Sequence, residues 1–149
     1  MISFKKKTSG FTIVELLIVI VVIGILAALV IVTYNGIQQK ARDTERKTDI
    51  KAVQGQLEAY WANNAKYPTL ANLNDATFRN ANMKGLDPAA LADPKNAGSQ
   101  AACAATAANC YGYAVTPAGC DNAANGDCDN YTLTATLESG GTFSVQSNN

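Results

Sequence analysis

The sequence predicts an α+β protein in which one long helix precedes a small antiparallel sheet, and three observations support this prediction. Residues 16–32 carry no charge, and helical periodicity continues beyond them to about Ala65. Residues 111–147 contain short runs in which apolar and polar residues alternate, which is the pattern of half-buried strands. Four cysteines lie within 26 residues, from Cys103 to Cys128, and indicate a small domain braced by disulfides.

The apolar segment at residues 11–33 can cross the ~30 Å hydrocarbon core of a membrane as a helix. Three lysines precede it at residues 5–7 and are expected to stay cytoplasmic, so the rest of the chain should lie outside the cytoplasm. An ordinary secretory signal has a shorter apolar run, followed by a small-residue cleavage site. Here the small residue beside the run is Gly10, which precedes it. Cleavage there would remove the lysines and keep the helix.

The segment GFTIVEL at residues 10–16 resembles the processing site of the type IV pilin family, which includes the pseudopilins of type II secretion. The resemblance covers about residues 9–28 and implies the pilin fold, a long N-terminal helix packed on a small C-terminal sheet. It also implies that a prepilin peptidase cuts between Gly10 and Phe11 and methylates the new amino group of Phe11. Many copies would then stack their N-terminal helices into a helical filament.

This resemblance divides the chain into four segments, the last of which we call the head. They are a leader (1–10), a transmembrane and assembly helix (11–33), an amphipathic half of the helix (34–66) and an extracytoplasmic head (67–149).

The carboxylate of Glu15 lies within the apolar helix, where an unpaired charge is costly. After cleavage, Phe11 would carry an ammonium group in the same apolar setting, and methylation would retain its charge. In a filament, Glu15 of one copy can meet the Phe11 amine of its neighbour, which would fix the axial register. The alternative is that Glu15, near the cytoplasmic end, reaches interfacial water without a partner.

The helix departs from the family pattern because Val32 stands near the place where members often carry a proline. Glycines within residues 24–36 remain as weak points, so this region is expected to be the least regular part in a filament. Residues 38–47 are polar on every face and predict a solvated connector, with ion pairs between subunits as the alternative. Residues 50–61 carry an apolar stripe that should pack on the head.

The head is expected to begin with a loop at residues 69–102 that contains at most brief helical turns, followed by a three-stranded meander. Its apolar core is small, so covalent bridges are expected. The cysteines allow three pairings, and the local one is favoured because it closes a loop before the first strand and another between strands. The favoured pairs are Cys103–Cys110 and Cys120–Cys128.

One head loop partly resembles an EF-hand calcium loop, with oxygen-bearing side chains near alternating positions. These candidates are Asp121, Asn125, Asp127 and Asp129. Ala123 stands where a ligand is needed and no helix pair flanks the loop, so a solvated acidic turn is the favoured interpretation. Calcium, which some pseudopilins bind in their C-terminal loops, is the weaker one, and no other cofactor is expected.

The composition argues against an enzyme and against a nucleic-acid-binding head. The chain has no histidine, and no nucleophile–base pair or closed metal site is evident. From Gly85 onward one cation accompanies six acids, whereas nucleic-acid-binding faces are basic.

The resemblance therefore implies a structural subunit, first of all the major subunit of a type IV pilus. Such a protein is a single-pass precursor in the inner membrane, and later part of a cell-surface fibre that can serve adhesion or twitching motility. Its expected partners are further copies of itself, prepilin peptidase, the membrane and the inner-membrane pilus assembly machinery. The alternatives are a pseudopilin of a type II secretion system and a minor or DNA-uptake pilin.

Overall fold

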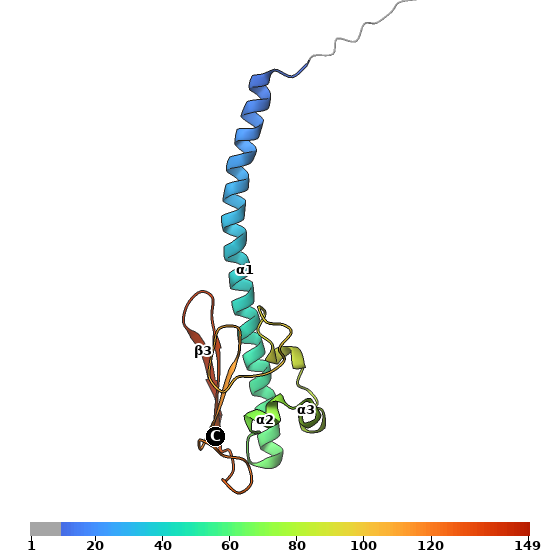
Figure 1. Cartoon of the computed structure of the whole chain (residues 1–149), viewed down its shortest axis with the longest axis vertical. Helices are drawn as coiled ribbons and strands as arrows, with labels where there is room; N and C mark the ends of the chain where they lie inside the picture. Colours follow the sequence, from blue (N-terminus) through green and yellow to red (C-terminus); the bar gives the residue numbers. More distant parts are fainter. Residues whose placement is uncertain (1–9) are drawn as a thin grey trace, which may run out of the picture. The chain divides into compact units, whose positions relative to one another are not determined.

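The computed structural model describes residues 10–149, so the predicted leader lies, apart from Gly10, outside the described residues. One compact unit ends at Gln38 and a second comprises Gln39–Asn149. The elements in order are α1 (Ile13–Asn64), α2 (Leu70–Asn74), α3 (Ala76–Asn82), the 3₁₀ turn η1 (Pro88–Leu91), β1 (Gly112–Thr116), β2 (Asn130–Thr136) and β3 (Thr142–Gln146) (Figure 1). The predicted α+β class is confirmed. The predicted bounds of the four segments stay predictions.

Helix α1 is continuous over 52 residues. It passes through Gly24 and Gly36 without interruption, so the irregularity expected of this region in a filament is not a property of the single chain. A helical glycine costs only about 1 kcal/mol relative to alanine, which strong helix formers on either side can offset. The helix ends where Ala65 adopts a left-handed φ of 53° and donates its N–H to the carbonyl of Trp61 at 2.7 Å.

The first unit presents its apolar side chains outward. Every large apolar side chain from Phe11 to Ile37 is exposed. Within the part of the chain that the structure describes, α1 is the one helix that is long and apolar enough to cross a membrane, and its most apolar stretch is wholly unburied. This surface must therefore be covered by lipid or by other polypeptide.

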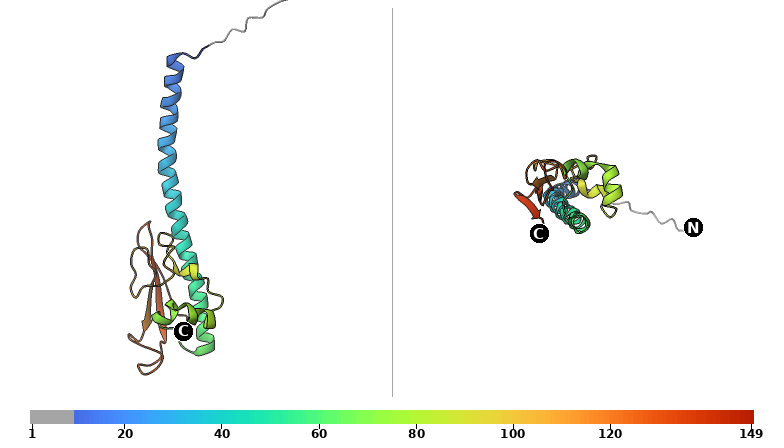
Figure 2. Two further views of the ribbon diagram at one scale, coloured as in Figure 1. Left: turned by 45° about the vertical axis from the view of Figure 1, so that its right-hand side comes forward. Right: turned by 90° about the horizontal axis from the view of Figure 1, so that it is seen from below.

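The second unit contains an antiparallel meander in the order β1-β2-β3, which lies beside the C-terminal part of α1 (Figures 1 and 2). Tyr113 is opposite Leu133, and Leu133 is opposite Val145. The turn between β2 and β3 uses Gly140 and Gly141 at φ of 100° and 79°, a conformation in which a side chain would be strained. This matches the predicted meander.

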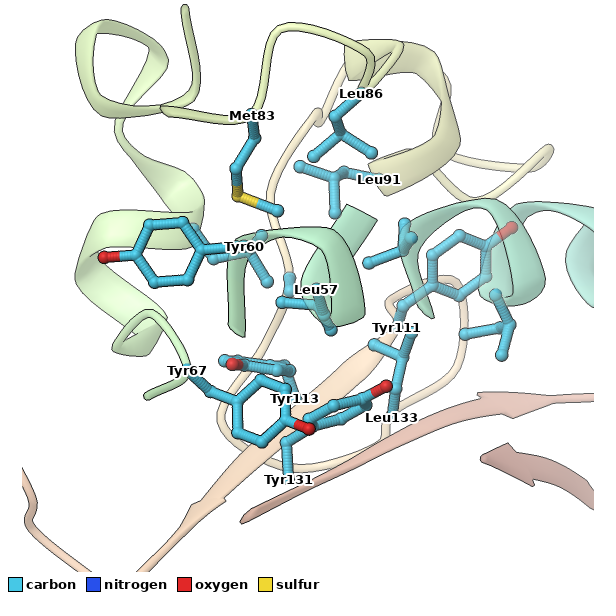
Figure 3. Packing of buried hydrophobic residues seen from close by; sticks show 14 of the residues in the cluster. Leu57, Tyr60, Tyr67, Met83, Leu86, Leu91, Tyr111, Tyr113, Tyr131 and Leu133 are labelled. Carbon is cyan, nitrogen blue, oxygen red and sulfur yellow. The ribbon is translucent and has the colours of Figure 1, made fainter. Parts of the chain in front are cut away.

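The core lies between the sheet and one face of α1 (Figure 3). The predicted stripe is buried through Ile50, Val53 and Leu57, which are fully inaccessible to solvent. Aromatic rings supply much of the remaining volume, and the rings of Tyr67 and Tyr131 meet edge to face with centroids 4.7 Å apart.

The segment between α1 and the sheet forms short helical elements rather than a bare loop. Each starts at a residue whose side-chain oxygen accepts a backbone N–H, which is the usual helix N-cap. The three caps are Thr69 for α2, Asp75 for α3 and Asp87 for η1. The expected brief helical turns are present, and the longest of them, α3, has seven residues.

Candidate functional site

The predicted processing junction is accessible in the structure. Phe11 is 88% exposed. No atom lies within 4 Å of the point where a side chain on Gly10 would begin. Nothing in the described chain therefore shields this peptide bond from a protease. That the cut falls between Gly10 and Phe11 stays a prediction.

Glu15 closes a capping box with Thr12 at the start of α1. The backbone N–H and the hydroxyl of Thr12 donate to Oε2 of Glu15 at 2.8 and 2.7 Å. In return, the N–H of Glu15 donates to the Thr12 hydroxyl at 3.2 Å. This reciprocal pair satisfies two of the helix's unpaired N–H groups. Thr12 was not among the predicted site residues, although Thr-x-x-Glu before an apolar run is the signature of a capping box.

The capping box satisfies only part of the Glu15 carboxylate. Oε1 accepts no hydrogen bond from any of residues 10–149 in the structure, and no cation of these residues lies within ion-pair distance. One oxygen is therefore held by neutral donors, while the other can accept a bond from a positively charged group. The pairing of Glu15 with Phe11 of a neighbouring copy stays a prediction, and this geometry is compatible with it.

A cluster of charges that was not predicted from the sequence joins α1 to the head. Arg46 is 1% exposed, and its Nε and Nη2 bind both carboxylate oxygens of Asp93 at 2.7 and 3.0 Å. Its Nη1 binds Asp43 and Glu138, each at 2.9 Å. The prediction of a solvated connector at residues 38–47 is therefore wrong at Asp43 and Arg46, because segments from elsewhere in the chain cover this side of the helix.

The same cluster fixes the turn between β2 and β3. Arg42 forms two bonds to the carboxylate of Glu138 at 2.7 and 2.8 Å, and Lys95 approaches the same group at 2.8 Å. The carboxylate of Asp43 accepts the backbone N–H groups of Glu138 and Ser139. Cations and acids are balanced, so the cluster orients the head on α1 without a net charge.

The cluster also lowers the pKa values of its acids. Burial alone would raise the pKa of Asp43, but hydrogen bonds from Ser139, the Glu138 backbone and Arg46 outweigh burial and lower it to about 2. At Asp93, burial again raises the pKa, but the hydrogen bond from Arg46 and the other favourable contacts outweigh burial, so the pKa of Asp93 is also lowered. A hydrogen bond from Arg42 holds the pKa of Glu138 well below its usual range.

We expect the head to lose stability as the pH falls from about 4 to about 2. A carboxyl with a lowered pKa in the folded state stabilises the fold above its unfolded pKa, 3.8 for Asp43, and this contribution disappears as the pH falls through the folded value of about 2. Melting temperature measured against pH tests the expectation. Asp43→Asn should flatten part of the dependence, whereas equal slopes for both proteins would contradict the assignment.

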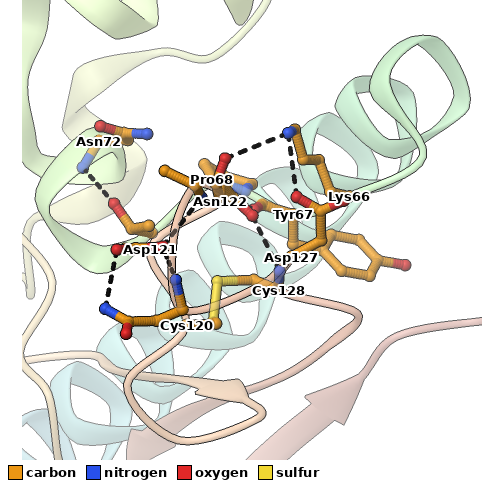
Figure 4. Close-up of a disulfide and its surroundings, with 12 residues drawn as sticks. Lys66, Tyr67, Pro68, Asn72, Cys120, Asp121, Asn122, Asp127 and Cys128 are labelled. Atoms are coloured by element: carbon orange, nitrogen blue, oxygen red, sulfur yellow. Dashed lines mark hydrogen bonds and ion pairs between the residues drawn. A yellow bond between two sulfur atoms is a disulfide. The ribbon is translucent and has the colours of Figure 1, made fainter.

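The disulfides join Cys103 to Cys110 and Cys120 to Cys128, which is the local pairing that the sequence favoured. None of the cysteines in the described residues is free. The second bridge closes a loop that is held against the end of α1, as Figure 4 shows. The N–H of Tyr67 donates to the carbonyl of Cys128, and the amide of Asn122 donates to the carbonyl of Tyr67, both at 2.8 Å.

The calcium candidates in this loop do not converge on a common point in the structure. The carboxylate of Asp121 accepts the N–H groups of Ala123 and Asn125, and Asp127 pairs with Lys66 at 3.0 Å. Across residues 10–149, no group of three or more acidic, histidine or cysteine side chains is arranged to hold a metal ion. These contacts describe an acidic turn closed on itself, and calcium binding stays an untested prediction of the sequence.

We expect millimolar calcium to leave the melting temperature of the full chain unchanged. A ligand that binds the folded state raises this temperature, so the measurement reports binding directly. A rise that a chelator reverses would show that the loop rearranges to bind the ion.

The comparisons with known proteins match the N-terminal part of the chain. Residues 5–31 match the family described as the prokaryotic N-terminal methylation motif. The chain is 40% identical over 72 residues to type II secretion system core protein G of Aeromonas hydrophila, covering 48% of this chain and 50% of that protein. It is 35% identical over 69 residues to type IV major pilin protein PilA of Myxococcus xanthus, covering 46% and 31%. No solved structure matches significantly.

The methylation motif overlaps the start of a long apolar helix, and a small disulfide-braced sheet follows, an arrangement that agrees with a precursor anchored in a membrane. The N-terminal part of the chain is therefore similar to type IV pilins and to the pseudopilins of type II secretion. The chain spans about half the length, or less, of these curated relatives.

Proposed function

We propose that this chain is the structural subunit of a type IV pilus, cut between Gly10 and Phe11, methylated on Phe11 and assembled through α1. The observation that carries the proposal is the state of the N-terminal part of α1. Its apolar side chains are all exposed, and Oε1 of Glu15 has no partner among residues 10–149.

Lipid alone can cover the exposed apolar side chains of α1, but it cannot supply a partner for the Glu15 carboxylate. The apolar side chains are stable in a bilayer, but a carboxylate there remains costly until it meets a cation. Cleavage creates such a cation on Phe11, four residues before Glu15 in the chain and next to the start of α1. Because the two groups can pair between copies, contact between neighbouring helices satisfies both the apolar surface and the charge, and a filament follows.

The head suits a fibre exposed outside the cell. Two disulfides and a neutral ion cluster hold together a domain whose apolar core is small. In this proposal the precursor spans the inner membrane, the pilus assembly machinery extracts it, and the finished fibre lies at the cell surface. Purifying surface fibres and identifying their main protein tests it. Long fibres built chiefly from this chain support it, whereas only traces in a mixed fibre would contradict the major role.

The second candidate is a pseudopilin, which would form a short filament of a type II secretion system. The similarity to core protein G of Aeromonas hydrophila, and likewise of Vibrio cholerae at 39% over 64 residues, favours it. Deleting the gene discriminates between the two candidates. Loss of surface fibres with normal protein secretion supports the pilus, and loss of secretion without loss of fibres supports the pseudopilin.

Gly10→Trp is expected to leave the precursor uncut. Prepilin peptidase must bring the backbone at this junction into its active site, and a large side chain on the residue before the cut obstructs that approach. Mass spectrometry of the membrane fraction measures the N-terminus. Gly98→Leu, at an exposed head glycine with open space around it, is the matched control and should give the product that begins at methylated Phe11. Mature-size protein from Gly10→Trp would refute the cut site.

A further inference from the structure

One exposed flank of α1 carries a row of lysines. We define this lysine row as Lys40, Lys47 and Lys51, whose spacing of seven and four residues places them on one side of the helix. None of the three forms an ion pair with residues 10–149, unlike Arg42 and Arg46 on the covered side.

The helix surface beside the lysine row is lined by small exposed side chains. They are Ala41, Thr44, Thr48, Ala52 and Gly55. With no bulky group there, a neighbouring molecule can approach the helix closely enough to reach the lysines.

The opposite charge is concentrated in one place. The acidic loop, residues 120–129, carries Asp121, Asp127 and Asp129 on its exposed surface. Lys66 pairs with Asp127 only, so the other two acids have no cation within ion-pair distance in the described chain. The Cys120–Cys128 disulfide and the bonds to Tyr67 fix the loop at the end of α1, which makes it a rigid acidic surface (Figure 4).

The two charged surfaces of one molecule cannot meet each other. The acidic loop is held next to the residues that follow Asn64, the last residue of α1, whereas Lys47 lies 17 residues earlier on the same helix. At 1.5 Å per residue, this separates them by about 25 Å along the helix axis. A parallel second copy shifted by about this distance would bring its acidic loop level with Lys47 and Lys51.

We propose that the lysine row of one copy binds the acidic loop of a second copy in the filament. The contact joins two different surfaces, the lysine row of one copy and the acidic loop of the next, with a shift along the helix axis. Repeating such a contact adds copies to an open filament and does not close into a ring. Complementary charge would steer incoming subunits and select the axial register of the heads. This interface rests on the proposed filament function and adds to it a contact between α1 of one copy and the head of another, separate from the one at Glu15.

A charge swap in the full chain, expressed in the producing bacterium, tests the interface. Lys47→Glu and Asp129→Lys should each reduce the sheared filament fraction at least about tenfold, because each places like charges opposite one another. The double variant, with both substitutions in one chain, should recover filaments because the swapped pair again attracts. Lys47→Gln should reduce filaments less than Lys47→Glu. Lys84→Glu, at an exposed lysine outside the lysine row, should assemble like the unaltered chain.

The amount of processed, disulfide-bonded subunit in the membrane must be equal in all variants. If a charge reversal lowers this amount, the milder Lys47→Gln is compared with the unaltered chain instead. Unchanged filaments from either single reversal would overturn the interface, as would a double variant that assembles no better than the singles. If the unaltered chain forms no filaments, the proposed function fails and the interface with it.

Discussion

Glu15→Val is expected to abolish filament assembly while leaving membrane insertion and cleavage after Gly10 intact. The substitution makes α1 more apolar, so insertion is favoured. In the proposed filament it would leave the Phe11 ammonium of each neighbouring copy without its anion in an apolar setting, and removing one partner of a buried pair costs about 3–5 kcal/mol. That cost recurs at every subunit. The yield of sheared filaments, relative to processed subunit in the membrane, measures the effect.

Glu15→Gln separates the charge of Glu15 from its role in the capping box. Glutamine at this position can still accept a hydrogen bond from Thr12, so the cap is retained while the negative charge is lost. We expect this variant to fail in assembly as well. Glu45→Gln, on an exposed part of the same helix, should assemble normally. Normal filaments from Glu15→Gln would show that the cap is sufficient and would contradict the pairing with Phe11.

Arg46→Met is expected to destabilise the head by about 3–5 kcal/mol. Methionine can fill much of the space but cannot bind the carboxylates of Asp93, Asp43 and Glu138, which would be left buried around an uncharged side chain. Denaturant unfolding of the full chain in detergent, followed by the signal of the head, measures the change. Lys84→Met, at an exposed site with no ion pair in the described chain, should stay within about 0.5 kcal/mol. A loss below 1 kcal/mol for Arg46→Met would show that the cluster is dispensable.

The long helix, the strands and the disulfide pairing could be predicted from sequence because each depends on local information. Periodicity gave the buried face of α1 at Ile50, Val53 and Leu57, and alternation gave the inward residues of β2. The cysteines pair over separations of seven and eight residues, which loop closure favours.

The ion cluster could not be predicted in the same way. Arg46 meets Asp93 and Glu138 across separations of 47 and 92 residues. A helix segment with opposite charges three or four residues apart has the pattern of a solvent-exposed surface. Which side of it is buried depends on where distant parts of the chain pack, and the local sequence does not contain that information. The capping box at Thr12 is different, since its signal is local. Thr12 and Glu15 are three residues apart, so this contact could have been predicted from their spacing at the start of the apolar segment.

If the chain forms the proposed pilus fibre, the position of the ion cluster has a mechanical consequence when that fibre is under tension. Arg42, Asp43 and Arg46 are the first residues of α1 to hold the head, through the turn between β2 and β3. Load passing along the helix from its N-terminal end reaches these bonds before it reaches the apolar core. Several charge-assisted bonds that share this load resist peeling better than side chains that slide past one another. Stretching single fibres with and without Arg46→Met would measure this protection.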